Sequence, residues 1–226
     1  NEMDHKKFQE ALRVHKSILA DAEKRLLIKI ANKLPKWVNS DHLTILGFVG
    51  MAFAGVSYWL SSFNKYWLIL VVVSLFVNWF GDSLDGTVAR VRNKLRPRYG
   101  FYVDHIVDAF GILFLLGGLI FSNYISAAIG LVLLITYFLM SIEIYLATYA
   151  IGKFQISFGI WGPTELRILL AIGSLYLLHK THVTIAGSKF LLFDVGGICA
   201  IIGILTGVIV STVRNIKTLY EQETIF

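Results

Sequence analysis

The sequence predicts an all-α integral membrane protein with six transmembrane helices and an N-terminal amphipathic helix at the membrane interface. Of its 226 residues, 56% are hydrophobic and the mean hydropathy is +0.66, which is too apolar for an ordinary soluble domain of this length. Apolar windows of roughly 20 residues, long enough to cross a bilayer, occur six times. We place them at residues 43–61, 66–89, 100–121, 124–150, 164–179 and 190–213.

The basic residues predict how these spans are oriented. The formal net charge is +6 at pH 7, but the basic residues lie beside the spans and form no separate domain, so we expect no nucleic-acid partner. Nine of the 21 Lys and Arg residues precede the first span, and five more lie around the connector between the second and third spans. The positive-inside rule therefore places both termini and this connector in the cytoplasm.

The N-terminal segment predicts an amphipathic helix over residues 5–34. Apolar residues recur there at spacings of three and four between charged residues. We expect this helix to lie in the cytoplasmic headgroup layer with its lysines near anionic lipid, and packing against a partner copy is the alternative. Pro35 ends the helix, and residues 39–42 (Asn-Ser-Asp-His) supply N-cap chemistry for the span that begins at Leu43.

We expect one membrane domain with short extensions. Residues 1–42 form the juxtamembrane helix and linker, residues 43–213 the six-span membrane domain, and residues 214–226 a cytoplasmic tail. In the last span, Gly203 and Gly207 form a small-xxx-small pattern, which is explained equally by packing within one subunit or by a dimer contact. The single cysteine of the chain excludes an internal disulfide.

Other residues in or beside the spans are predicted to have structural roles. Tyr58, Trp59 and Trp67 flank the first outer loop and are expected to form an aromatic belt at the membrane surface. Glu143 in the fourth span and Asp194 in the sixth are interpreted as carboxylates satisfied within the fold.

The stretch from Gly81 to Asp108 places four aspartates at lipid depth. Asp82 and Asp85 are three residues apart and Asp104 and Asp108 four apart, so each pair projects from one helix face. A carboxylate at this depth is costly unless it is paired or bound to a cation. Four carboxylates that face one another require neutralisation by divalent cations, and oxygen ligands favour Mg²⁺ or Mn²⁺ over zinc.

Two classes of function use such a cluster. Two metal ions held by aspartates are a recurrent device of phosphoryl transfer, and Arg90 with the basic connector would make a suitable phosphate clamp. The same carboxylates could instead form the pore site of a divalent-cation transporter. The composition alone favours catalysis only modestly.

The spacing of these residues is similar to the signature of the CDP-alcohol phosphotransferase family. The pattern is Asp-x2-Asp-Gly-x2-Ala-Arg-x9-Gly-x3-Asp-x3-Asp, and the six-span layout with an interfacial helix resembles the family as well. The resemblance implies that an alcohol attacks the phosphorus of a CDP-linked substrate and that CMP leaves. All eight defining positions are present, as Asp82, Asp85, Gly86, Ala89, Arg90, Gly100, Asp104 and Asp108.

The resemblance also implies roles for individual residues. Asp82, Asp85 and Asp104 would hold two Mg²⁺ or Mn²⁺ ions, and Asp108 would both contact a metal and act as base toward the acceptor hydroxyl. A homodimer with its active site facing the cytoplasm is implied as well. The residues implied to bind the nucleotide and diphosphate are Thr44, Asp85, Gly86, Ala89, Arg90 and Gly100.

Three further residues are candidates for the acceptor or phosphate site. Glu165 and Arg167 lie in a Gly-Pro-Thr-Glu-Leu-Arg segment at the start of the fifth span. They are explained equally by a capping turn formed with Thr164, in which Arg167 extends to the interface. The Thr-Glu pair and His105 resemble the choline and ethanolamine phosphotransferase branch, whereas residues 106–109 are more typical of bacterial phosphatidyltransferases.

The favoured hypothesis is an enzyme of phospholipid synthesis that transfers a phosphatidyl group from CDP-diacylglycerol to a small polar alcohol. In the alternative, CDP-choline or CDP-ethanolamine donates its phospho-head group to diacylglycerol. The motif does not distinguish the two, because both reactions release CMP from a CDP-linked donor.

Overall fold

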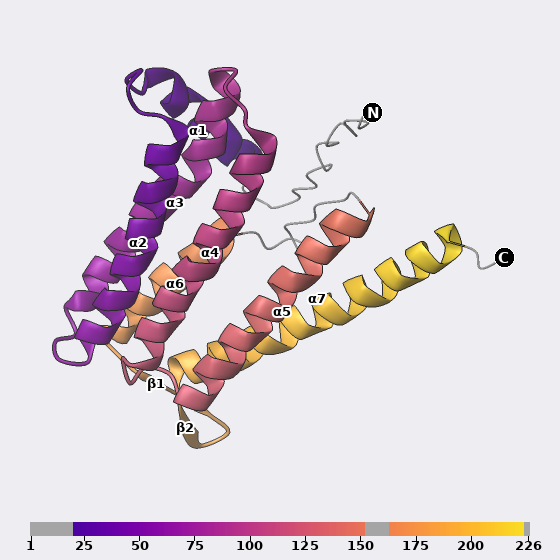
Figure 1. Ribbon diagram of the computed structural model, residues 1–226. Helices are drawn as coiled ribbons and strands as arrows, with labels where there is room; N and C mark the ends of the chain where they lie inside the picture. Colours follow the sequence, from indigo (N-terminus) through magenta and orange to yellow (C-terminus); the bar gives the residue numbers. More distant parts are fainter. Residues whose placement is uncertain (1–19, 152–162, 224–226) are drawn as a thin grey trace, which may run out of the picture.

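The computed structural model describes residues 20–151 and 163–223 (Figure 1). Within them the chain forms seven helices and one two-stranded hairpin. The elements are α1 (Ala20–Lys33), α2 (Ser40–Ser61), α3 (Trp67–Val91), α4 (Pro97–Ile120), α5 (Ala127–Ile151), α6 (Pro163–Leu177), β1 (His182–Ile185), β2 (Ser188–Leu191) and α7 (Leu192–Gln222).

Five helices of the described chain, α2, α3, α4, α5 and α7, are long and apolar enough to cross a membrane. The prediction of an integral multi-pass membrane protein is therefore confirmed. The fifth predicted span, 164–179, corresponds to α6, which has 15 residues. At 1.5 Å per residue α6 is about 22 Å long, which is less than the roughly 30 Å of a hydrocarbon core. That α6 crosses the membrane, and with it the count of six spans, therefore stays a prediction.

The β1–β2 hairpin lies between α6 and α7, where we predicted only a loop and the start of a span. Its strands pair antiparallel, with His182 opposite Leu191. The turn residues Ala186 and Gly187 have φ values of 50° and 85°, and two successive positive values are typical of the type I′ turn that suits a two-residue hairpin. The all-α class is confirmed by the seven described helices, and this hairpin of eight residues is an addition that the sequence did not indicate.

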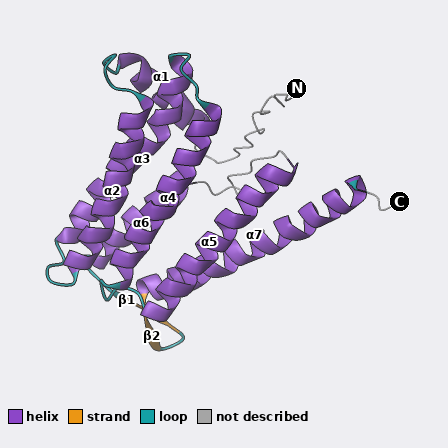
Figure 2. Cartoon of the chain, viewed as in Figure 1, coloured by secondary structure: helices purple, strands orange, loops and turns teal. Residues whose placement is uncertain are grey.

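The helices form two groups (Figure 1). One contains α2, α3, α4 and α6, with α1 at one end, called here the α1 end, and the hairpin at the other. The second group is the pair α5 and α7, which contact each other and lean away from α4 toward the α1 end (Figure 2). The carboxylate motif lies on α3 and α4 at the α1 end of the first group.

Helix α1 docks on the first group through one apolar face. Leu27 and Ala31 are buried in a cluster with Leu43, Leu84 and Val88, which joins α1 to the start of α2 and the end of α3. The predicted helix over residues 5–34 is confirmed from residue 20 to residue 33, and its first part lies outside the described residues.

The connections at the α1 end follow the predicted boundaries. The Asn39 side chain accepts from the His42 backbone N–H at 2.9 Å, and His42 Nδ1 accepts from the Asn39 N–H at 3.4 Å, so a capping box starts α2. Pro97 begins α4, where its missing N–H has no helical partner to lose. Arg92, in the basic connector, donates to the Leu34 carbonyl at 3.0 Å and so fastens the end of α1.

The structural carboxylates are satisfied as predicted. Glu143 of α5 accepts from Ser211 Oγ at 2.7 Å and from Asn215 Nδ2 at 2.8 Å, which ties α5 to α7. Asp194 of α7 accepts from the backbone N–H and the hydroxyl of Ser126 at 2.6 and 2.5 Å. These bonds hold the second helix group together and connect it to the α4–α5 turn.

Two of the three residues predicted to form the aromatic belt lie on the surface of the helices. Trp59 and Trp67 are 49% and 37% exposed. Tyr58 is fully buried, and its hydroxyl lies 2.6 Å from Ser174 Oγ of α6. The prediction was wrong for Tyr58 because its position on the inner face of α2 brings it against α6.

Glycines allow α2 and α3 to pack closely beside the motif. A Cβ at Gly50 would lie 2.7 Å from the Asn78 nitrogen, and a Cβ at Gly47 would lie 3.0 Å from the Asp82 nitrogen. Both neighbours are backbone atoms, so they cannot move aside as a flexible side chain can. The close approach therefore fixes where Asn78 and Asp82 stand relative to α2.

We expect Gly50→Ala to lower the free energy of unfolding by about 1–3 kcal/mol because the new methyl group forces the two helices apart. Melting of the purified protein in detergent, followed by circular dichroism, measures the change. Gly117→Ala in α4 is the matched control, since a Cβ there meets no atom within 4 Å and alanine favours the helix. Equal melting temperatures for the two variants would contradict this account of the packing.

Candidate metal and substrate site

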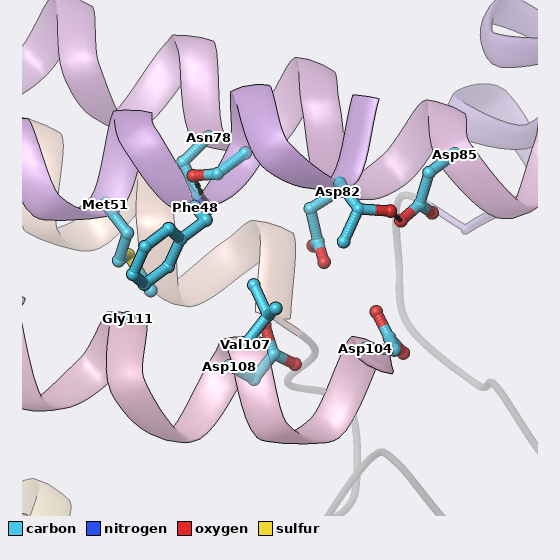
Figure 3. A pocket seen from close by; sticks show the side chains of 11 residues that line it. Phe48, Met51, Asn78, Asp82, Asp85, Asp104, Val107, Asp108 and Gly111 are labelled. Carbon is cyan, nitrogen blue, oxygen red and sulfur yellow. Dashed lines mark hydrogen bonds between the residues drawn. The ribbon is translucent and has the colours of Figure 1, made fainter. Parts of the chain in front are cut away.

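Three of the four predicted metal ligands converge between α3 and α4. Asp82, Asp104 and Asp108 each offer a carboxylate oxygen, and these oxygens lie within 4.8 Å of one another. Figure 3 shows Asp82 pointing from α3 toward the two aspartates of α4. Such a group of oxygen donors fits a divalent cation of the Mg²⁺ or Mn²⁺ type. We call these three residues the carboxylate cluster.

Asp85 stands beside the carboxylate cluster and is tied to α2 (Figure 3). Its Oδ2 accepts from Thr44 Oγ1 at 2.7 Å, and its Oδ1 accepts from the Gly86 N–H at 2.5 Å. Thr44 and Asp85, both predicted nucleotide-site residues, are thus brought together across two helices. This bond orients the Asp85 carboxylate next to the cluster.

Arg167 of α6 points into the carboxylate cluster and not toward the interface. Its Nη2 lies 2.5 Å from Asp82 Oδ2, and its side chain is only 14% exposed. The ion pair places one permanent positive charge among the carboxylates, where a guanidinium can also bind phosphate. Glu165 is buried on the same helix, and Thr164 donates to Glu23 of α1.

A pocket lies between α2, α3 and α4, with the carboxylates at one end and apolar residues at the other (Figure 3). The motif of aspartates and small residues did not predict which residues line the apolar end. The lining residues are Thr44, Gly47, Phe48, Met51, Asn78, Asp82, Asp85, Asp104, Val107, Asp108 and Gly111.

Asn78 is a member of this pocket that sequence reasoning missed. Its side chain is 4% exposed, and Nδ2 donates to the Gly47 carbonyl at 2.9 Å. Because that carbonyl only accepts, the bond fixes which side of the amide carries oxygen. No described residue donates to Oδ1. The sequence did contain an indication, because Asn78 stands four residues before Asp82. This spacing puts both side chains on one face of α3.

The remaining motif residues lie outside the pocket lining that the described residues form. Gly86 is half-buried, Ala89 is buried, and Arg90 is exposed and donates to Thr87 Oγ1 at 3.2 Å. Gly100 is exposed, and a Cβ there would meet no atom within 4 Å. Arg90 and Gly100 are therefore at the surface of the α1 end, where a substrate larger than the pocket can reach them.

His105 belongs to an aromatic group next to Asp104. Its ring stacks on Phe101 with centroids 4.1 Å apart and meets Tyr145 of α5 edge-on at 4.9 Å. His105 Nδ1 lies 2.6 Å from the Phe101 carbonyl oxygen and 3.9 Å from Asp104 Oδ2. The group thus connects α5 to the motif helix, and Tyr145 is a neighbour that the sequence did not reveal.

The comparison with protein families agrees with this geometry. The family model described as CDP-alcohol phosphatidyltransferase matches residues 37–209, which is most of the chain. This chain belongs to the CDP-alcohol phosphatidyltransferase family. A comparison with curated proteins finds no significant match. The chain is therefore a membrane-embedded transferase of a phospholipid-synthesis family, and the resemblance of its motif to that family is confirmed.

Membership of the CDP-alcohol phosphatidyltransferase family gives the site a reaction class. It implies a CDP-linked donor and an alcohol acceptor, and the carboxylate cluster is consistent with the divalent metal typical of the family. The divalent-cation transporter, the second class considered from the sequence, is set aside because the matched residues include both halves of the motif.

Proposed function

We propose that this family member transfers a phosphatidyl group from CDP-diacylglycerol to a small polar alcohol and releases CMP. The observation that carries the proposal is the convergence of three carboxylates and Arg167 at one end of a pocket between membrane-crossing helices. A lipid-linked donor suits this position, because its acyl chains can stay among the spans while its diphosphate reaches the charged end.

The carboxylates account for metal binding in this proposal. Asp82, Asp104 and Asp108 lie close enough to share a divalent ion, and Asp85 completes the set for a second one. Bound Mg²⁺ or Mn²⁺ would neutralise charge on the phosphate oxygens and make the acceptor hydroxyl easier to deprotonate.

The chain's own residues have three tasks in the transfer. Asp108 takes the proton of the acceptor hydroxyl, the hydroxyl oxygen forms a bond to the phosphatidyl phosphorus, and the bond from that phosphorus to the CMP oxygen breaks. Arg167 contacts the diphosphate from α6. The nucleotide is bound at the α1 end by Thr44, Asp85, Gly86, Ala89, Arg90 and Gly100.

The donor is tested directly with purified enzyme and Mg²⁺. Three candidate acceptors are supplied in turn: glycerol, which is uncharged, choline, which is cationic, and glycerol 3-phosphate, which is anionic. We expect CMP release from CDP-diacylglycerol with at least one of them. The lipid product identifies the acceptor. CMP release from CDP-choline or CDP-ethanolamine with diacylglycerol, and none from CDP-diacylglycerol, would assign the alternative direction of transfer. In that case His105 and Glu165 become the first residues to test for head-group binding.

The proposal extends to the arrangement in the membrane. In it α6 crosses the membrane as the fifth of six spans. Residues 1–42 form the extension, residues 43–213 the catalytic domain and residues 214–226 the tail, and both termini and the site face the cytoplasm. A homodimer is also proposed. A Cβ at Gly203 of α7 would meet no described atom within 4 Å, so this position of α7 has room for a second copy of the chain.

We expect Asn78→Leu to raise the KM of the acceptor alcohol roughly tenfold while the KM of CDP-diacylglycerol stays within about twofold. We propose that Asn78 Oδ1, which lies in the pocket and accepts from no described residue, accepts from the hydroxyl of the acceptor alcohol. Leucine has a similar size but no such oxygen. Initial rates of CMP release at varied acceptor and donor concentrations separate the two constants. Asn215→Leu, on α7 and outside the pocket lining, is the control, and a selective rise in the donor KM would contradict this role of Asn78.

A further inference from the structure

One carboxylate of α1 is bonded to two of the helices that contribute to the charged end of the site, α3 and α6. Glu23 Oε1 accepts from Trp79 Nε1 at 2.7 Å and from Ser83 Oγ at 3.3 Å, both on α3. The same oxygen accepts from Thr164 Oγ1 of α6 at 2.9 Å. Glu23 therefore bridges α3 and α6, although it belongs to neither.

The bridge lies beside a second connection between the same helices. Ser83 follows Asp82 directly, and Thr164 stands three residues before Arg167. Arg167 and Asp82 form the ion pair at 2.5 Å. The two connections close a ring through α3 and α6, so the separation set by Glu23 also determines how far Arg167 reaches toward Asp82.

Docking of α1 also has an apolar contribution that does not involve Glu23. The apolar face of α1 already docks through Leu27 and Ala31, which are buried against α2 and α3. Glu23 lies on the same face of α1, one turn before Leu27, and contacts the first turn of α6, where a carboxylate is favoured by the helix dipole. Three donors on one charged oxygen make a stronger connection than neutral hydrogen bonds do.

We propose that Glu23 is a positioning residue of the transfer reaction. By joining α3 to the first turn of α6, it holds the Arg167 guanidinium at the carboxylate cluster, where it meets the donor diphosphate. The helix predicted to lie in the lipid headgroup layer is thereby part of the catalytic apparatus. The inference rests on the proposed function, because that function gives Arg167 its phosphate contact.

A double-mutant cycle between Glu23 and Arg167 tests this role. We expect Glu23→Ala to lower kcat/KM for CDP-diacylglycerol roughly tenfold, the size expected for losing a charge-assisted hydrogen bond. In an Arg167→Ala background the same change should cost less than about twofold, because interacting residues are not additive. Glu23→Gln, whose amide keeps the accepting oxygen, should recover most of the activity. Asp21→Ala, exposed on the same helix, should change nothing.

Several outcomes would overturn the inference. Equal losses from Glu23→Ala in both backgrounds would show that it acts independently of Arg167. A lower melting temperature with unchanged kcat/KM for the folded fraction would show a purely structural role. Thr164→Val gives a second approach if Glu23→Ala folds poorly, and it should show the same coupling. If wild-type enzyme uses CDP-choline instead, the proposed donor is wrong, but the cycle is run with CDP-choline and still decides the role of Glu23.

Discussion

Asp108→Asn is expected to reduce the rate of CMP release by roughly 10²- to 10⁴-fold, the usual contribution of a general base. Asparagine keeps the shape of the side chain and one oxygen, but it cannot take the proton of the acceptor hydroxyl. Asp108 is in a suitable place for this task, because it lines the pocket and belongs to the carboxylate cluster. Single-turnover release of labelled CMP from CDP-diacylglycerol measures the chemical step.

The control for Asp108→Asn is the same substitution at Asp194, a carboxylate with a structural role outside the site. Asp194→Asn removes a charge that serves Ser126 on the far side of the fold, and the rate should stay within about twofold because no reacting group is near. Near-normal turnover of Asp108→Asn would refute the base assignment. Loss of turnover together with loss of all metal binding would instead make Asp108 essential for the metal alone.

The spans were predictable because apolar runs and helix signals are local properties. The first span was placed at 43–61 and α2 runs from Ser40 to Ser61. The third span was placed at 100–121 and α4 runs from Pro97 to Ile120. The hairpin was missed because its strands are four residues each, too short to show an alternating pattern. The place of Tyr58 was missed because the sequence alone does not tell which face of α2 meets α6.

The site was predictable in its chemistry and only partly in its membership. Regular spacing puts each pair of aspartates on one helix face, and Asp82, Asp104 and Asp108 come together once α3 and α4 both pack against α2. Arg167 is 85 residues away in sequence from its partner Asp82. Glu23 is 141 residues away from its partner Thr164. No spacing rule connects such distant positions, so these contacts required the tertiary structure.

Removal of divalent cations is expected to abolish CMP release, with a loss of at least about 10³-fold that Mg²⁺ or Mn²⁺ restores. The carboxylate cluster has three acidic groups but one arginine within the described site, so its negative charge is only partly offset by the chain. Initial rates after EDTA treatment and dialysis, followed by titration with Mg²⁺, give the loss and the metal concentration for half-maximal activity.

The melting temperature is a second readout, and it separates a metal that takes part in catalysis from one that only stabilises the folded protein. A ligand that binds only the folded state raises the melting temperature, so Mg²⁺ should stabilise the wild type in the absence of substrates. Asp82→Asn and Asp104→Asn should each weaken this stabilisation and raise the Mg²⁺ requirement more than tenfold. Asp108→Asn should keep most of the stabilisation while losing turnover. If Mg²⁺ leaves the melting temperature of the wild type unchanged, Arg167 alone offsets the cluster, and the metal enters only with the CDP-linked donor.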